Sequence, residues 1–115
     1  MFTVTNLGPS DRAILERRVR GLVDAALVAE HRASPFGPHS PQLTEVLHFL
    51  RRNPSPDVPR YVVHRCGEPP RWTVGLKPTR PGGPIPFIGE RGYETQEEAE
   101  HEVFVRRLKF YGLGV

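Results

Sequence analysis

The sequence predicts an α+β fold: two N-terminal helices at a tight Pro/Gly corner, a small antiparallel sheet of about three strands, and a C-terminal helix packed on it. Three observations support this prediction. Helical apolar spacing occupies the first part of the chain, two short segments alternate like strands after it, and the stretch Tyr93 to Tyr111 carries helix-capping residues at both ends.

We expect one domain over residues 1–115, because this is an ordinary length for a single core. Within it we expect a possible arm at 1–9, a helical half at 10–53, a proline-rich linker at 54–59, and the sheet with its helix at 60–115. With 13 prolines and 11 glycines, much of the chain must be loop, and its core must be modest. Such a core favours a partner chain that completes it.

The first helix is expected from Asp11 to about Ala33, with Ser10 as its N-cap. Its apolar face is formed by Leu15, Val19, Leu22, Val23, Ala26 and Leu27. Gly21 lies inside this helix, where glycine costs about 1 kcal/mol relative to alanine. A close contact with another helix at Gly21 would explain its presence.

The segment Ser34 to Pro41, S-P-F-G-P-H-S-P, cannot continue a helix and predicts a rigid turn. Phe36 is its only large apolar side chain, and we expect it to fill the core or to contact a partner. Ser40 and Pro41 then restart a helix as N-cap and first residue, and this helix ends before Pro54. Its buried positions are Leu43, Val46, Leu47 and Leu50.

Two strands are expected at Arg60 to Arg65 and Arg71 to Leu76, joined as a hairpin through C-G-E-P-P. A third is expected at Ile85 to Ile88, where Pro86 confines it to an edge of the sheet.

The C-terminal helix begins with Thr95 and Glu98 as a capping box and ends at Gly112. Its apolar residues are Ala99, Val103, Phe104, Leu108, Phe110 and Tyr111, a face broad enough to cover a sheet. We expect Phe104 and Leu108 in the core.

We find no sequence motif that is typical of an active site. His31, His39, His48, His64 and His101 form no H-E-x-x-H motif and no closely spaced pair on one element, so we expect no metal ligand. His101, flanked by Glu100 and Glu102, is expected on the surface with a proton affinity affected by the glutamates. Cys66 lacks a C-x-x-C partner, and we expect neither a catalytic residue nor a cofactor in this chain.

The net charge of +3 mixes 16 basic with 13 acidic residues and favours an anionic partner only weakly. One cysteine and no signal-like start indicate the cytoplasm, and no apolar run approaches the roughly 20 residues that span a membrane. Partner contacts are expected at uncovered aromatic and arginine side chains, namely Phe2, Phe36, Tyr61, Trp72 and Arg71. The alternative for Phe36 and Trp72 is that they complete the internal core.

Two blocks, R-A-S-P-F-G-P-H-S-P-Q-L-T-E-V-L-H-F-L-R at Arg32 to Arg51 and G-E-R-G-Y-E-T-Q-E-E-A-E-H-E-V-F-V-R-R-L at Gly89 to Leu108, resemble the small subunit of N,N-dimethylformamidase. The segments Y-V-V at Tyr61 and W-T-V-G at Trp72 add to this resemblance. It implies a non-catalytic subunit that pairs with a larger amidohydrolase subunit, which holds a mononuclear iron and the catalytic residues. It also implies a hetero-oligomer with two copies of each chain.

The three strands followed by a capped helix, Arg60 to Lys109, also resemble the AP2-type and phage-integrase arm domains, which read DNA with their sheet. With Tyr61 and Trp72, the basic residues on this half would form a groove-facing sheet, namely Arg60, Arg65, Arg71, Lys77 and Arg80. The alternative is that arginines at strand ends protect the sheet edges against aggregation. The N-terminal helices, which that module lacks, and the modest net charge favour the subunit interpretation. DNA binding stays open as the alternative.

Overall fold

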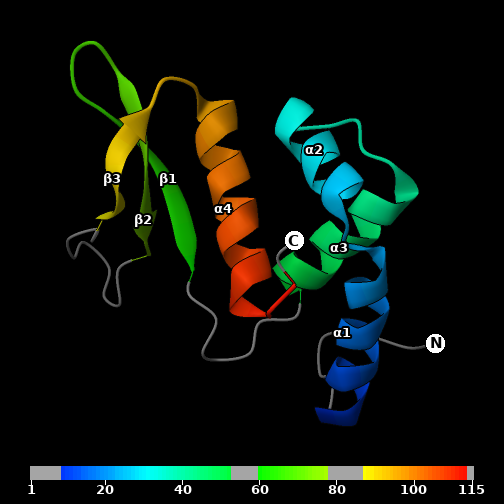
Figure 1. Cartoon of the computed structure of the whole chain (residues 1–115). Coiled ribbons are helices and arrows are strands. Elements are labelled where there is room, and N and C mark those ends of the chain that lie inside the picture. The colour runs from blue at the N-terminus through cyan, green and yellow to red at the C-terminus, as the bar shows by residue number, and fades with distance from the viewer. Residues whose placement is uncertain (1–8, 53–59, 78–86, 114–115) are drawn as a thin grey trace.

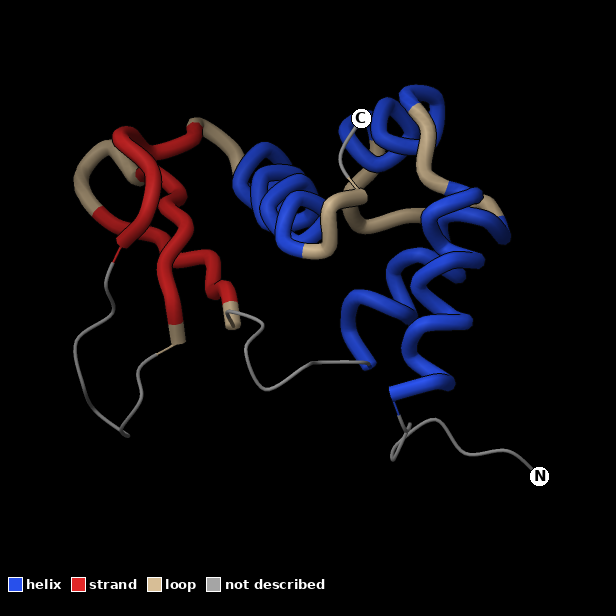
Figure 2. Tube along the Cα trace, turned by 60° about the horizontal axis from the view of Figure 1, so that its bottom comes forward, coloured by secondary structure: helices blue, strands red, loops and turns tan. Residues whose placement is uncertain are grey.

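A computed structural model describes residues 9–52, 60–77 and 87–113. Its elements are α1 (Pro9–Leu22), α2 (Ala25–Ala33), α3 (Pro41–Arg52), β1 (Tyr61–Cys66), β2 (Arg71–Leu76), β3 (Phe87–Tyr93) and α4 (Gln96–Phe110). The predicted α+β class is confirmed, although three helices rather than two precede the sheet. Helix α4 lies between the sheet and the group of α1, α2 and α3 (Figure 1; Figure 2).

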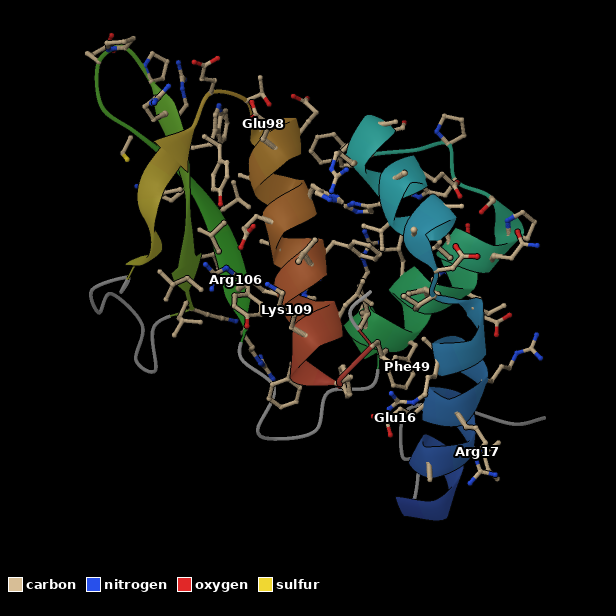
Figure 3. The ribbon with its side chains drawn as sticks, viewed as in Figure 1. Glu16, Arg17, Phe49, Glu98, Arg106 and Lys109 are labelled. Carbon is tan, nitrogen blue, oxygen red and sulfur yellow. The ribbon has the colours of Figure 1, made fainter. Side chains whose placement is uncertain are left out.

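Helix α4 is buried on two sides, which accounts for its broad apolar face. Toward the sheet, its Ala99 and Val103 pack with Val74 of β2. Toward the helices, its Phe104 and Leu108 join a larger buried cluster drawn from α1, α2 and α3. Phe104 is 2% exposed and Leu108 is 1% exposed, so both predicted core residues are confirmed. Phe49 of α3 lies where α1, α3 and the end of α4 meet (Figure 3).

Both ends of α4 carry the predicted caps. The Thr95 hydroxyl oxygen accepts from the Glu98 backbone N–H at 3.2 Å, and the hydroxyl donates to the Glu98 carboxylate at 3.0 Å. The glutamate therefore pairs with the threonine side chain rather than with its backbone N–H. At the other end Gly112 has φ +68°, and the Leu113 N–H returns to the Leu108 carbonyl at 2.8 Å. This is a Schellman motif, with Leu113 buried against the helix.

The prediction of one long first helix is wrong, because the helix is interrupted between Leu22 and Ala25. Asp24 takes an extended conformation there, and its carboxylate accepts from the Leu27 N–H at 2.8 Å. An aspartate that satisfies a free N–H starts a new helix, α2. Because α1 begins at Pro9, Ser10 lies inside it and is not its cap.

The predicted helix contact at Gly21 is also wrong. A Cβ atom placed on Gly21 would have no described atom within 4 Å. The glycine lies one residue before the end of α1, so it weakens the helix beside the break rather than making room for a neighbour.

Helix α3 begins as predicted. Ser40 caps it by accepting from the Leu43 N–H at 3.2 Å, and the four predicted apolar positions are all buried.

The sheet is antiparallel, with strand order β1-β2-β3. The first two strands match their predicted ranges to within one residue, and β3 lies at an edge as Pro86 indicated, although it continues to Tyr93. A register shift lies between Trp72 and Val74, where β3 has extra residues opposite β2. The expected linker 54–59 and, apart from Pro9, the expected arm lie outside the described residues. Within the described ranges, no helix combines the length and the apolarity needed to cross a bilayer.

Candidate functional site

The turn between α2 and α3, Ser34 to Ser40, presents Phe36 to the outside and is called the Phe36 corner below. Phe36 is 58% exposed, whereas the preceding Pro35 is buried. The interpretation of Phe36 as a core residue is therefore wrong.

The backbone of the Phe36 corner is held by hydrogen bonds within the turn. The Ser34 hydroxyl donates to the Gly37 carbonyl at 2.8 Å, and the Gly37 N–H donates to the Ser34 carbonyl at 3.1 Å. A ring nitrogen of His39, Nε2, lies 3.0 Å from the same Ser34 carbonyl. Gly37 has φ +92°, a conformation that favours glycine. The exposed Phe36 is thus mounted on an ordered turn.

Glu30 of α2 holds Ser40, the last residue of the Phe36 corner, through two hydrogen bonds. Its carboxylate accepts from the Ser40 backbone N–H at 2.6 Å and from the Ser40 hydroxyl at 2.7 Å. These two hydrogen bonds hold the pKa of Glu30 below its ordinary value, and the bond from the Ser40 backbone N–H has the larger effect. The same serine that caps α3 is therefore bonded back to α2.

The other residues predicted for partner contacts differ in their placement. Tyr61 and Trp72 are half-buried and pack on the cluster of Val74, Ala99 and Val103, as the core alternative for Trp72 expected. Their contact with a partner stays a prediction. Arg71 is exposed and lies 3.6 Å from the Glu94 carboxylate. Phe2 lies outside the described residues.

Two further apolar side chains are exposed and were not predicted as contacts. Ile14 of α1 is 64% exposed, and Phe110 at the end of α4 is 42% exposed. For Ile14 the sequence did carry a signal, because it falls outside the three-and-four spacing of Leu15, Val19 and Leu22.

Two histidines far apart in sequence meet between α2 and α4. His31 is 3% exposed, and its Nδ1 atom lies 2.9 Å from Nδ1 of His101. The His31 ring stacks on Phe104 with ring centroids 4.0 Å apart. It also stacks on His39, with ring centroids 6.1 Å apart. The prediction of His101 as a surface histidine is wrong: it is half-buried, and its Nε2 atom has no hydrogen bond among the described residues.

The surroundings of both histidines favour the uncharged ring. Burial, followed by the nearby His101, His39 and Arg51, lowers the pKa of His31 to about 4. Burial and then Arg32 lower the pKa of His101, whereas the adjacent Glu102 opposes that change. One ring therefore donates its Nδ1 proton and the other accepts it.

The distance between the two rings fits a hydrogen bond better than a shared metal ion. Two nitrogens on a tetrahedral zinc, each at about 2.0 to 2.1 Å, lie about 3.3 to 3.4 Å apart. The Nδ1 atoms of His31 and His101 are closer, at 2.9 Å. Among the residues that the structure describes, no group of three or more His, Cys, Asp or Glu side chains could hold a metal ion.

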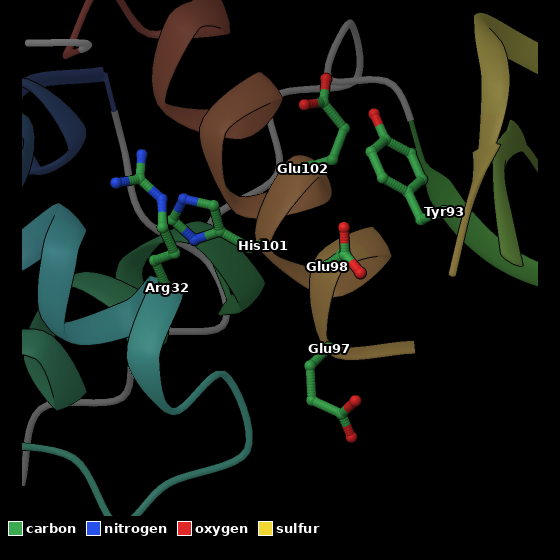
Figure 4. A pocket seen from close by; sticks show the side chains of 6 residues that line it. All are labelled: Arg32, Tyr93, Glu97, Glu98, His101 and Glu102. Carbon is green, nitrogen blue, oxygen red and sulfur yellow. The ribbon is translucent and has the colours of Figure 1, made fainter. Parts of the chain in front are cut away.

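A pocket of about 250 Å³ lies beside the histidine pair, and Figure 4 shows Arg32 of α2 next to His101 of α4. It is lined by Arg32, Tyr93, Glu97, Glu98, His101 and Glu102. Its carboxylates outnumber its guanidinium group, so its surface favours a cationic rather than an anionic neighbour. Its lining residues include no serine, threonine or cysteine nucleophile.

A family model described as the N,N-dimethylformamidase alpha subunit matches residues 9–113. The chain belongs to this family. A curated N,N-dimethylformamidase alpha subunit from Alcaligenes sp is 31% identical over 102 residues, covering 82% of this chain and 74% of that protein. The family match includes the N-terminal helices, the Phe36 corner and both histidines of the pair, which agrees with the resemblance seen in the sequence.

Proposed function

We propose that this chain is a non-catalytic small subunit of a hydrolase acting on amide C–N bonds, and that it stabilises a larger, iron-containing catalytic subunit. The family is named as an alpha subunit of N,N-dimethylformamidase, which supports the role of a subunit. Because the match includes α1, α2 and α3 as well as the sheet, it favours a subunit over a DNA-binding sheet module.

The observation that carries this proposal is the exposed ring of Phe36 on an ordered turn. Large aromatic side chains are enriched among the residues that dominate binding energy at protein interfaces. A ring held on a fixed backbone also loses little conformational freedom when it binds. At 58% exposure, Phe36 has apolar surface that the described part of this chain leaves uncovered.

The chemistry of the described side chains is consistent with a binding role. His31 of α2 and His101 of α4 are brought together by the fold and are hydrogen-bonded to each other. This contact holds α2 and α4 together, and His101 also lines the adjacent pocket. Because the family is named as an alpha subunit, we assign the reaction and its iron to the larger subunit.

The test is the affinity of the full chain for the larger subunit after Phe36→Ser. Loss of a buried aromatic contact should weaken association at least about tenfold, which corresponds to about 1.4 kcal/mol. The melting temperature of the free chain should hardly change, because the ring is exposed. Phe110→Ser is the matched control, since it removes an exposed phenylalanine at the distant end of α4. Unchanged affinity for Phe36→Ser, or an equal loss in the control, would contradict the assignment to this corner.

A further inference from the structure

We propose that the His31–His101 pair is a pH-sensitive latch, which holds α2 and the Phe36 corner against α4 at neutral pH and releases them in mild acid. The latch is a property of this chain alone and does not depend on the binding role of Phe36. It joins elements that are 70 residues apart in the sequence.

The contact geometry sets the condition for release. Two Nδ1 atoms at 2.9 Å need one proton between them, with the second nitrogen offering its lone pair. When a single ring is protonated, one donor and one acceptor still face each other. When both rings are protonated, two N–H groups and two positive charges meet, and the contact cannot persist.

The basic groups around the pair oppose its protonation. Arg51 of α3 and His39 of the corner face His31, and Arg32 of α2 faces His101. The packing of His31 under Phe104 adds the cost of placing a charge in a buried site. These groups explain why the neutral pair is stable near pH 7 and why added protons favour the open arrangement.

The acidic groups nearby are partly engaged elsewhere. Glu30 is bonded to Ser40 through both carboxylate oxygens. Glu102 lies 2.7 Å from Arg106 as an ion pair, although the Arg106 N–H is not directed as a hydrogen bond. Glu97, Glu98 and Tyr93 line the adjacent pocket on the His101 side. Glu102 opposes the lowering of the pKa of His101, but it does not replace the contact to His31.

Release would act on a defined part of the molecule. The latch holds the last turn of α2, which leads directly into the Phe36 corner. The sheet packs on the opposite side of α4 through Val74, Ala99 and Val103, and this cluster contains no histidine. Opening should therefore be local to α2 and the corner, leaving β1 and β2 protected.

Amide hydrogen exchange on the full chain, monitored by NMR from about pH 7.5 to 4, tests the latch. The protection factors of α2, corrected for intrinsic exchange rates, should fall at least about tenfold as the imidazole signals titrate. Those of β1 and β2 should hold over the same range. Equal loss in α2 and the sheet, or α2 protection that ignores the histidine titration, would overturn the proposal.

Two variants separate the hydrogen bond from the ring. His101→Asn places a carboxamide where Nδ1 lies, so its oxygen can accept a hydrogen bond from a protonated His31. This variant should therefore lose less amide protection in α2 on acidification. His101→Gln places its carboxamide near the Nε2 position and should leave α2 poorly protected even at neutral pH. His48→Asn, on the exposed face of α3, should behave as the wild type. A full acid-induced loss in His101→Asn would contradict the latch.

Discussion

At the residue scale, the side chains that organise the site are the ones whose partners lie far away in sequence. His101 stands between two glutamates in the sequence, which suggested a solvated histidine. In the fold its partner is His31 of α2, and burial is the largest influence on its pKa. Local sequence shows the neighbours along one helix, whereas the packing of α2 over α4 decides this environment.

Glu30 provides a prediction at the same scale. Glu30→Gln removes the negative charge from the two contacts to Ser40 and should lower the melting temperature at pH 7. A carboxylate whose folded pKa lies below its unfolded value stabilises the fold above the unfolded pKa, and this contribution is lost as the pH falls through the folded pKa. The difference between wild type and variant should thus vanish in acid, below the ordinary range of a glutamate.

Thermal melts of both proteins across this pH range check the prediction. Glu68→Gln, an exposed glutamate in the turn between β1 and β2, is the control and should melt like the wild type throughout. If Glu30→Gln lowers the melting temperature by the same amount at neutral and acidic pH, the effect comes from the shape of the side chain and not from its charge.

At the element scale, capping chemistry predicted the start of α3 and both ends of α4, whereas the predicted cap at Ser10 was wrong. Thr95, Ser40 and Gly112 were each predicted from side-chain or backbone requirements that act within a few residues. The break between α1 and α2 was missed because the apolar spacing continues across it and hides the capping ability of Asp24. The length of β3 was missed because strand pairing with β2, rather than local preference, extends it to Tyr93.

Two glycines in similar positions should respond in opposite ways to alanine. Gly112 has φ +68°, so Gly112→Ala forces a left-handed conformation and should destabilise the chain by about 1 kcal/mol. Gly21 is helical with free space around it, so Gly21→Ala should stabilise the chain by about 0.5 to 1 kcal/mol. Denaturant unfolding of both variants measures the two changes. The same sign for both would contradict the assignment of these helix ends.

At the scale of the whole molecule, α4 contributes side chains to two separate hydrophobic cores. One cluster joins it to the sheet and the other joins it to α1, α2 and α3. The sequence predicted the sheet side, because a broad apolar face calls for a wide partner. It did not predict the helical side as a separate core, because the packing of α2 against α4 depends on tertiary contacts between segments that no local pattern connects.

Family membership and the exposed corner support our proposal that this chain stabilises a catalytic partner and performs no hydrolysis itself. Its most direct test is reconstitution of the larger subunit, expressed alone and loaded with iron, with the purified chain. Formamide hydrolysis and the thermal stability of the larger subunit are measured as the chain is added. The account predicts no turnover by the chain alone, a rise in both quantities on addition, and a higher concentration requirement for Phe36→Ser. Turnover by the isolated chain, or a larger subunit equally active and stable without it, would contradict the account.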